Sequence, residues 1–150
     1  MDITTIEALP FQKKFLDSLK RYPALIAGIG TGKTLFLLLK IMKFCLDYPD
    51  TLALIVRKEF TDLRDSTMKD FVRYFDIPIS SDKDVKLPQK SQLMFRHASE
   101  LAVLKNINLS IFGIEQAEEF ETEEAFTFLR DRLRRENAPL RQGCIIGNAS

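Results

Sequence analysis

Residues 28–34 read Gly-Ile-Gly-Thr-Gly-Lys-Thr, after the apolar residues 24–27 and before the apolar residues 35–39. A strand that leads into a glycine-rich turn and then a helix starting at Lys-Thr is the setting of a P-loop. Glycines allow backbone conformations in which successive N–H groups point at a bound triphosphate, beside the positive end of the following helix. The pattern therefore predicts a nucleoside triphosphate site.

Each residue type in this loop has a chemical reason. The Lys33 ammonium is expected to reach the β- and γ-phosphates, and the Thr34 hydroxyl to ligate magnesium. The strict pattern begins with glycine where this chain has Ala27, a departure that most turn geometries tolerate. The residues expected to bind the nucleotide here are Gly28, Ile29, Gly30, Thr31, Gly32, Lys33 and Thr34.

A second candidate segment follows the apolar residues 109–114. Glu115 ends this run, where a P-loop ATPase needs a carboxylate for the magnesium shell, at the tip of a strand beside the P-loop. Gln116 occupies the position of a second carboxylate, and its amide can orient a water but cannot accept a proton. Glu118 and Glu119 could supply the base, or could simply favour a helix start. The candidate catalytic residues are Lys33, Glu115, Gln116 and Glu119.

These groups must be positioned by alternating helical and strand segments, a pattern typical of parallel βαβ units. Residues 52–56 are apolar throughout, as expected of a strand buried on both faces. We therefore predict an α/β fold with a mainly parallel central sheet flanked by helices. The expected helices are residues 10–21, 33–48, 63–75 and 123–135; the expected strands are 24–27, 52–56, 92–96, 101–104, 109–114 and 144–147; residues 80–90 are expected to form an exposed loop.

Composition sets further limits. The chain has 150 residues, is 45% hydrophobic and carries a formal net charge of +1. These values suit one domain with a substantial core and exclude a strong basic field over the whole molecule. Cys45 and Cys144 lack metal or redox spacing and are expected to be reduced core thiols. Lys40 and Lys43 interrupt the most apolar stretch, residues 35–46, which is too short to cross a bilayer, so neither membrane insertion nor secretion is expected.

Five segments together point to one family. They are Leu9-Pro10-Phe11-Gln12, residues 28–34, Val56-Arg57-Lys58 with Leu63-Arg64-Asp65-Ser66, Glu115-Gln116-Ala117-Glu118-Glu119-Phe120, and Ile145-Ile146-Gly147-Asn148. In this order, and over nearly the whole chain, they resemble the N-terminal ATPase half of the large terminase subunits of tailed bacteriophages. The resemblance implies a P-loop NTPase fold of the ASCE, or RecA-like, class.

The resemblance also implies roles and partners. Gln12 corresponds to the glutamine that reads the adenine edge, and Asn148 to the coupling motif that senses the γ-phosphate. ATP and Mg²⁺ are the implied cofactors. Hydrolysis in that family drives double-stranded DNA through the portal protein into the capsid, with a small terminase subunit helping to choose the DNA. A ring of identical subunits, located in the host cytoplasm at the procapsid portal, is implied.

The chain departs from the family pattern at three points. Many large terminases carry an arginine in the P-loop region where this chain has Ile29, and Gln116 replaces the usual glutamate. The missing positive charge would have to come from elsewhere, in cis or from a neighbouring subunit. The candidate arginine fingers are Arg57, Arg64, Arg73 and Arg96, although any single one is more readily interpreted as a solvated or salt-bridged surface residue. Residues 1–150 leave no room for a nuclease half and are expected to be the N-terminal ATPase domain of a longer chain.

Two other functions stay open. A helicase-like translocase also carries a glutamine before its P-loop, although a helicase core normally needs a second motor domain. A nucleotide-binding assembly or regulatory module with weak hydrolysis would fit the Gln116 substitution. A basic cluster is expected either to face DNA phosphates or to form a charged helix face; its members are Arg130, Arg132, Arg134, Arg135 and Arg141.

Overall fold

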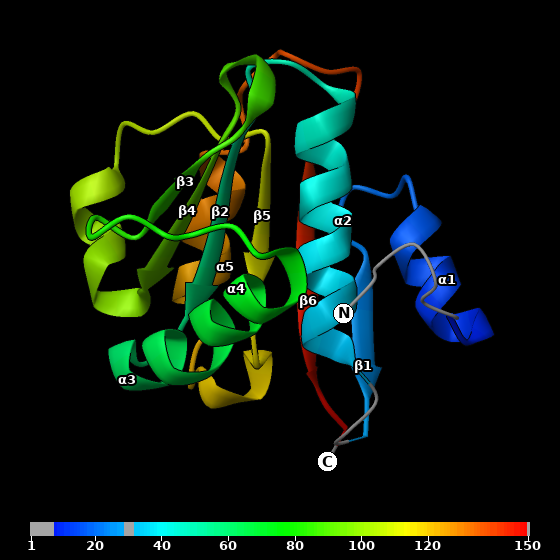
Figure 1. Cartoon of the computed structure of the whole chain (residues 1–150). Helices are drawn as coiled ribbons and strands as arrows, with labels where there is room; N and C mark the ends of the chain where they lie inside the picture. Colours follow the sequence, from blue (N-terminus) through cyan, green and yellow to red (C-terminus); the bar gives the residue numbers. More distant parts are fainter. Residues whose placement is uncertain (1–7, 29–31, 150) are drawn as a thin grey trace.

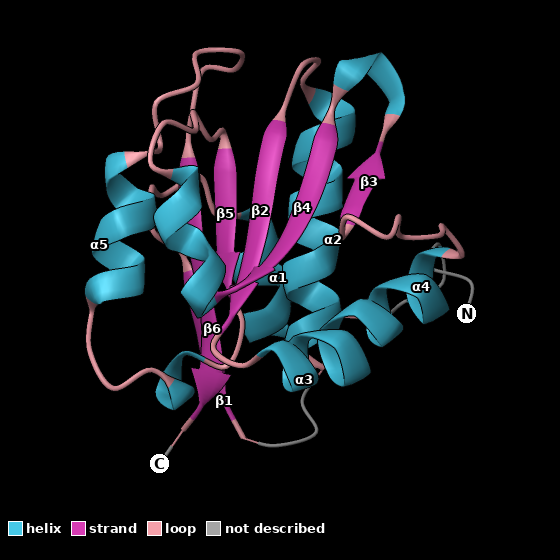
Figure 2. Cartoon of the chain, turned by 90° about the vertical axis from the view of Figure 1, so that its left-hand side faces the viewer, coloured by secondary structure: helices cyan, strands magenta, loops and turns pink. Residues whose placement is uncertain are grey.

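The computed structural model describes residues 8–28 and 32–149. A six-stranded sheet lies at the centre, with its strands in the order β1-β6-β5-β2-β4-β3 (Figures 1 and 2). Neighbouring strands pair in parallel, except that β3 runs antiparallel to β4. The predicted mainly parallel α/β sheet is confirmed. The strands are β1 (Ala24–Ala27), β2 (Leu52–Arg57), β3 (Asp84–Lys86), β4 (Gln92–His97), β5 (Ile111–Ile114) and β6 (Gln142–Asn148).

Helices cover both faces of the sheet (Figures 1 and 2). One face carries α1 (Pro10–Asp17), α2 (Lys33–Asp47) and α4 (Lys69–Phe75), and the other carries α5 (Glu124–Asp131) and a 3₁₀ helix, Ala98–Leu104. The predicted helix over residues 63–75 starts earlier than expected, because α3 (Phe60–Asp62) continues through a π-helical turn, Leu63–Met68, into α4.

Each face of the sheet supports its own hydrophobic core. Ala53 and Ile55 of β2 pack into the core under α2, whereas Leu54 and Val56 pack into the core under α5. Successive side chains of a strand point to opposite faces, so a strand covered on both sides must be apolar at every position. Cys144 lies in the first of these cores as a free, buried thiol, as predicted.

The strand predicted at residues 101–104 is wrong, because these residues belong to the 3₁₀ helix Ala98–Leu104. The Glu100 carboxylate accepts a hydrogen bond from the backbone N–H of His97 at 3.0 Å, and this capping interaction starts the helix. The same carboxylate forms an ion pair with Lys83 at 2.6 Å. Leu101 is buried as a helical rather than a strand residue.

The exposed loop predicted at residues 80–90 is also wrong in part, because it contains β3. Val85 is buried in the core at 2% exposure, and Leu87 packs against the same core. Pairing with β4 satisfies the backbone groups on either side of Val85. A three-residue edge strand with one apolar side chain carries almost no periodicity for sequence analysis to detect.

Two helices end earlier than predicted. α1 stops at Asp17, because Ser18 adopts an extended backbone, and α5 stops at Asp131. Beyond α5 the backbone N–H of Arg135 donates to the carbonyl of Leu109, so the chain has already turned back toward β5. Within residues 8–28 and 32–149, none of the helices has the length and apolar character needed to cross a membrane.

Candidate functional site

The P-loop residues that the structure describes lie at the carboxyl end of β1. Gly32 precedes α2 with φ +73°, a left-handed conformation that glycine adopts without strain. The Lys33 ammonium donates a hydrogen bond to the carbonyl of Gly28 at 2.8 Å, so its charge lies next to the end of β1. The remaining predicted loop contacts, Ile29, Gly30 and Thr31, fall outside the described residues.

Thr34 connects the P-loop to the second candidate segment. Its hydroxyl donates a hydrogen bond to Oε1 of Glu115 at 2.7 Å. Glu115 lies beside the P-loop although β6 separates β5 from β1 in the sheet. Contact is made because α2 packs across β5: a Cβ atom on Gly113 would lie 2.8 Å from Cδ1 of Leu37. Glycine at that position therefore lets α2 approach the strand that carries Glu115.

Glu115 is 1% exposed. Burial raises the pKa of this carboxyl to about 7, although the Thr34 hydrogen bond and the positive charge of Arg57 act in the opposite direction. Its Oε2 atom is buried and receives no hydrogen bond from the residues that the structure describes. A buried carboxylate oxygen without a donor is costly unless it is protonated or faces a cation.

This donor set fits a magnesium ion bound together with a nucleotide. Magnesium prefers hard oxygen ligands and is commonly held by one or two carboxylates plus substrate phosphates. Thr34 and Glu115 supply a hydroxyl and a carboxylate at the end of the P-loop. In the described part of the chain, no group of three or more His, Cys, Asp or Glu side chains is arranged for a metal.

Gln116 directly follows in a left-handed conformation, φ 53° and ψ 61°, before a 3₁₀ turn over Ala117–Glu119. Its Oε1 atom is buried and accepts no hydrogen bond from the described residues. A positive φ in a residue other than glycine is unusual and is retained where the surroundings demand it. The structure therefore holds a carboxamide beside Glu115, in the place where a second carboxylate was considered.

Arg57 is the last residue of β2, the strand next to β5 in the sheet. Its buried guanidinium donates to both carboxylate oxygens of Glu119, at 3.2 and 3.4 Å, and to the Thr67 hydroxyl at 3.3 Å. Glu119, a predicted catalytic residue, is thus engaged in an ion pair. The sequence did not predict a role for Thr67, because a single threonine in a helical segment forms no recognisable motif.

The other three candidate arginines pair with acidic neighbours outside this arrangement. Arg64 binds Asp65 at 2.7 Å and Arg73 binds Asp70 at 3.1 Å, both at exposed positions. Arg96 in β4 pairs with Asp84 of β3 at 2.9 Å. Among the four, the charge that bears on Glu115 is that of Arg57.

Gln12 and Asn148 both lie next to the P-loop. Gln12 is 6% exposed, and its Nε2 atom lies 3.8 Å from the point that a Cβ on Gly32 would occupy. Asn148 ends β6 opposite Ala27 of β1, and its backbone N–H donates to Oε1 of Glu118 at 3.0 Å. The fold therefore brings both segments to the site at which the sequence analysis expected them to act.

The family model described as phage terminase large subunit matches residues 20–146. This chain belongs to that family. The helicase-like alternative is thereby set aside, and no curated protein matches the chain.

Solved terminase structures share the fold. The large terminase from a thermophilic bacteriophage superimposes with a TM-score of 0.76 at 13% identity, covering 95% of this chain and 39% of its own. The Thermus phage P74-26 large terminase ATPase domain superimposes with a TM-score of 0.68 at 13% identity, and the match covers 94% of this chain and 64% of that domain. A chain of the bacteriophage Phi-29 packaging motor assembly superimposes with a TM-score of 0.59 at 16% identity. That match covers 95% of this chain and 48% of the motor chain. The chain thus spans about two fifths of the first of these terminases.

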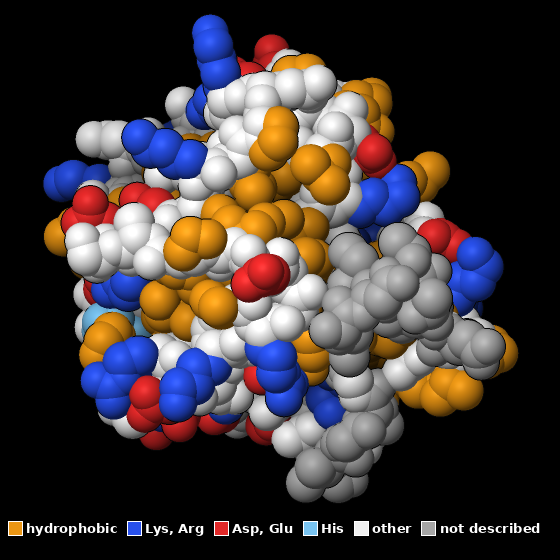
Figure 3. All heavy atoms as spheres, viewed as in Figure 1, with side chains coloured by type: hydrophobic (Ala, Val, Ile, Leu, Met, Phe, Trp, Pro, Cys, Tyr) orange, Lys and Arg blue, Asp and Glu red, His pale blue; other side chains and the backbone are white. Residues whose placement is uncertain are grey.

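In this terminase chain the basic cluster is tied to local structure. Arg132 stacks on Phe128, with 3.7 Å between its guanidinium carbon and the ring centroid, and Arg135 pairs with Asp50 at 2.8 Å. Both arginines lie beyond the end of α5 at Asp131, so the predicted charged helix face does not extend to them. Figure 3 shows the opposite, α2-bearing face, on which basic and acidic side chains are interspersed.

Proposed function

We propose that this chain is the ATP-binding and ATP-hydrolysing motor domain of a viral DNA-packaging terminase. The observation that carries the proposal is the Thr34–Glu115 hydrogen bond, which joins the end of the P-loop to a buried carboxylate. The large terminase of the thermophilic bacteriophage has been solved in complex with ADP and with ATP-γ-S. Residues 1–150 form the N-terminal ATPase domain, and hydrolysis drives double-stranded DNA translocation into the capsid.

Each group at the site has a task. Lys33 holds the β- and γ-phosphates, while Thr34 and Glu115 hold Mg²⁺, which when bound neutralises phosphate charge. Gln12 reads the adenine edge, and Asn148 at the end of β6 senses the γ-phosphate. Gln116 orients the attacking water through its carboxamide but does not take its proton.

Arg57 is the charge-stabilising arginine of this site and acts in cis. Its burial and its influence on Glu115 support this role over Arg64, Arg73 and Arg96. Because Arg57 holds both oxygens of Glu119, that carboxylate serves to position the arginine rather than to act as the base.

The assembly is proposed from the family. The chain works as a homo-oligomeric ring at the portal protein of the procapsid, in the host cytoplasm, with a small terminase subunit selecting the DNA. The Phi-29 packaging motor assembly has the same fold in its matching part, which supports a motor of this kind.

The decisive experiment compares Lys33→Ala with Lys43→Ala. Lys43 lies on the same helix but is exposed and pairs with Asp47 at 2.6 Å. Lys33→Ala is expected to lose ATP binding and turnover, whereas Lys43→Ala keeps both. Normal ATP binding and hydrolysis by Lys33→Ala would overturn the proposal.

A second function is favoured by one observation, the carboxamide of Gln116 in the place of a second carboxylate. This substitution suits a nucleotide-binding assembly or regulatory module that hydrolyses weakly. Turnover of the wild type beside Gln116→Glu separates the two functions. A large gain in Gln116→Glu favours the module, and robust wild-type turnover favours the motor.

A further inference from the structure

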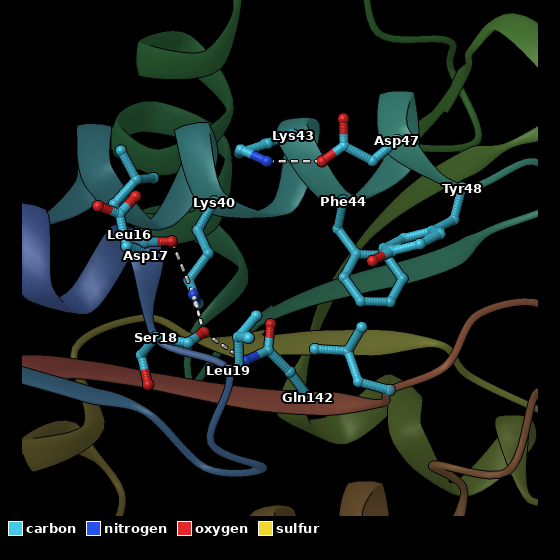
Figure 4. Close-up of a pocket in the computed structure, with 11 residues that line it drawn as sticks. Leu16, Asp17, Ser18, Leu19, Lys40, Lys43, Phe44, Asp47, Tyr48 and Gln142 are labelled. Carbon is cyan, nitrogen blue, oxygen red and sulfur yellow. Dashed lines mark hydrogen bonds and ion pairs between the residues drawn. The ribbon is translucent and has the colours of Figure 1, made fainter.

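A small pocket of about 150 Å³ lies between the end of α1, the middle of α2 and the start of β6 (Figure 4). Its notable feature is a buried lysine, Lys40, at 5% exposure. The Lys40 ammonium donates to the backbone carbonyls of Leu16 and Ser18, both at 2.9 Å. From β6, the Gln142 amide donates to the carbonyls of Ser18 and Lys20, at 2.8 and 2.7 Å.

These bonds satisfy the carboxyl end of α1 and the turn that follows it. The last carbonyls of a helix have no partner within the helix, and a positive charge near them is favourable. Burial lowers the pKa of Lys40, so the site itself disfavours the charge. Because Lys40 is buried and still donates two hydrogen bonds to backbone carbonyls, we conclude that it holds the chain between α1 and β1 in one position.

The opposite end of α1 explains why that position matters. Gln12 and Leu16 are one helical turn apart, so a helix held at Leu16 also holds the backbone of Gln12, whose carboxamide oxygen accepts a hydrogen bond from the N–H of Leu9 at 2.8 Å. That carboxamide lies beside Gly32, at the start of α2. Lys40 lies on the same helix as Lys33 and Thr34. One helix therefore presents the phosphate-binding groups and also holds the segment that carries Gln12.

We propose that Lys40 and Gln142 are positioning residues that set the place of Gln12 and thereby the preference of the site for adenine over guanine nucleotides. This inference rests on the proposed ATP site. Neither side chain touches the nucleotide. Both act through α1. They hold the carbonyls at the carboxyl end of this helix, while Gln12, in its first turn, contacts the base.

The test measures dissociation constants for ATP and GTP with the wild type and with Lys40→Met, which keeps the length of the side chain but loses both carbonyl bonds. We expect affinity for ATP to fall about tenfold with little change for GTP, as the loss of one well-placed hydrogen bond to the base would produce. The matched control is Lys43→Met, three positions along the same helix and exposed, which should keep the wild-type ratio.

Further variants separate positioning from a general effect on stability. Lys40→Arg retains the donors and should retain most of the ATP/GTP ratio. Gln12→Ala should lose the ratio, and adding Lys40→Met to it should cause no further loss, since both changes remove one interaction. Where Lys40→Met does not fold, Gln142→Leu carries the same expectation, because it removes the bonds to Ser18 and Lys20 alone.

A folded Lys40→Met or Gln142→Leu variant with the wild-type ATP/GTP ratio would overturn the inference. A wild type that binds ATP and GTP equally would overturn it as well, while leaving the proposed ATPase intact. A wild type that binds neither nucleotide would remove the proposed function itself, so the two failures are distinguishable.

Discussion

The Thr34 hydroxyl and the Glu115 carboxylate are 2.7 Å apart although they are separated by 81 positions in the sequence. Thr34 lies in the first turn of α2 and Glu115 follows β5, and the two meet because α2 packs closely over Gly113. The contact orients one carboxylate oxygen while the other, also buried, has no donor among the described residues. This pairing is the structural basis of the proposed magnesium site.

The first prediction concerns Thr34. Thr34→Val keeps the shape of the side chain but removes the hydroxyl, so the Mg²⁺-dependent part of ATP binding should weaken about ten- to a hundredfold. Thr34→Ser retains a hydroxyl and should stay near the wild type. Titration of ATP with and without Mg²⁺ measures the difference, and equal Mg²⁺ dependence in Thr34→Val and wild type would contradict the assignment.

The second prediction concerns the pH dependence of stability without nucleotide. Burial raises the pKa of Glu115 from 4.5 to about 7, so between these values the folded state keeps a proton that the unfolded state releases. The free energy of unfolding should therefore fall as the pH rises through this window, by on the order of 3 kcal/mol for this group.

Glu115→Gln removes the titration and should flatten that part of the profile. Urea unfolding of both proteins at pH 4.5, 6 and 7.5 makes the comparison, and the variant should be the more stable at the highest pH. An unchanged slope in Glu115→Gln would show that another group controls this range.

The third prediction separates Arg57 from an exposed arginine. Arg57→Ala leaves Glu119 and Thr67 without their partner and should lower the free energy of unfolding by about 2–3 kcal/mol, with turnover reduced more than ATP binding. Arg73→Ala removes an exposed pair with Asp70 and should change stability by less than about 1 kcal/mol. Similar effects of the two substitutions would argue against a special role for Arg57.

The fourth prediction tests the packing of β6 on β5. A Cβ on Gly143 would overlap the ring of Phe112, which is fully buried. Gly143→Ala should therefore lower the free energy of unfolding by about 1–3 kcal/mol. Adding Phe112→Leu makes room and should recover part of the loss from Gly143→Ala. Strictly additive losses in the double variant would mean that the two positions do not compete for space.

The sequence by itself determined the features that depend on neighbouring residues. The apolar runs predicted the buried parallel strands, and the glycine-rich turn before Lys33 predicted where α2 begins. Glu115 was likewise predicted as a site residue because it follows an apolar strand. These predictions succeed because strand burial and loop chemistry are written in consecutive residues. The short strand β3 and the 3₁₀ helix Ala98–Leu104 were missed because pairing with β4 and a capping carboxylate, rather than periodicity, decide them.

Only the tertiary structure decided which distant groups meet. Nothing in the order of residues shows that Arg57 binds Glu119, or that Lys40 holds the end of α1. The Arg57 contact arises because the order of strands in the sheet places the ends of β2 and β5 side by side, whereas the Lys40 contacts arise because α1 packs against α2. Local pattern thus identified the chemical groups, whereas packing decided their partners and charges.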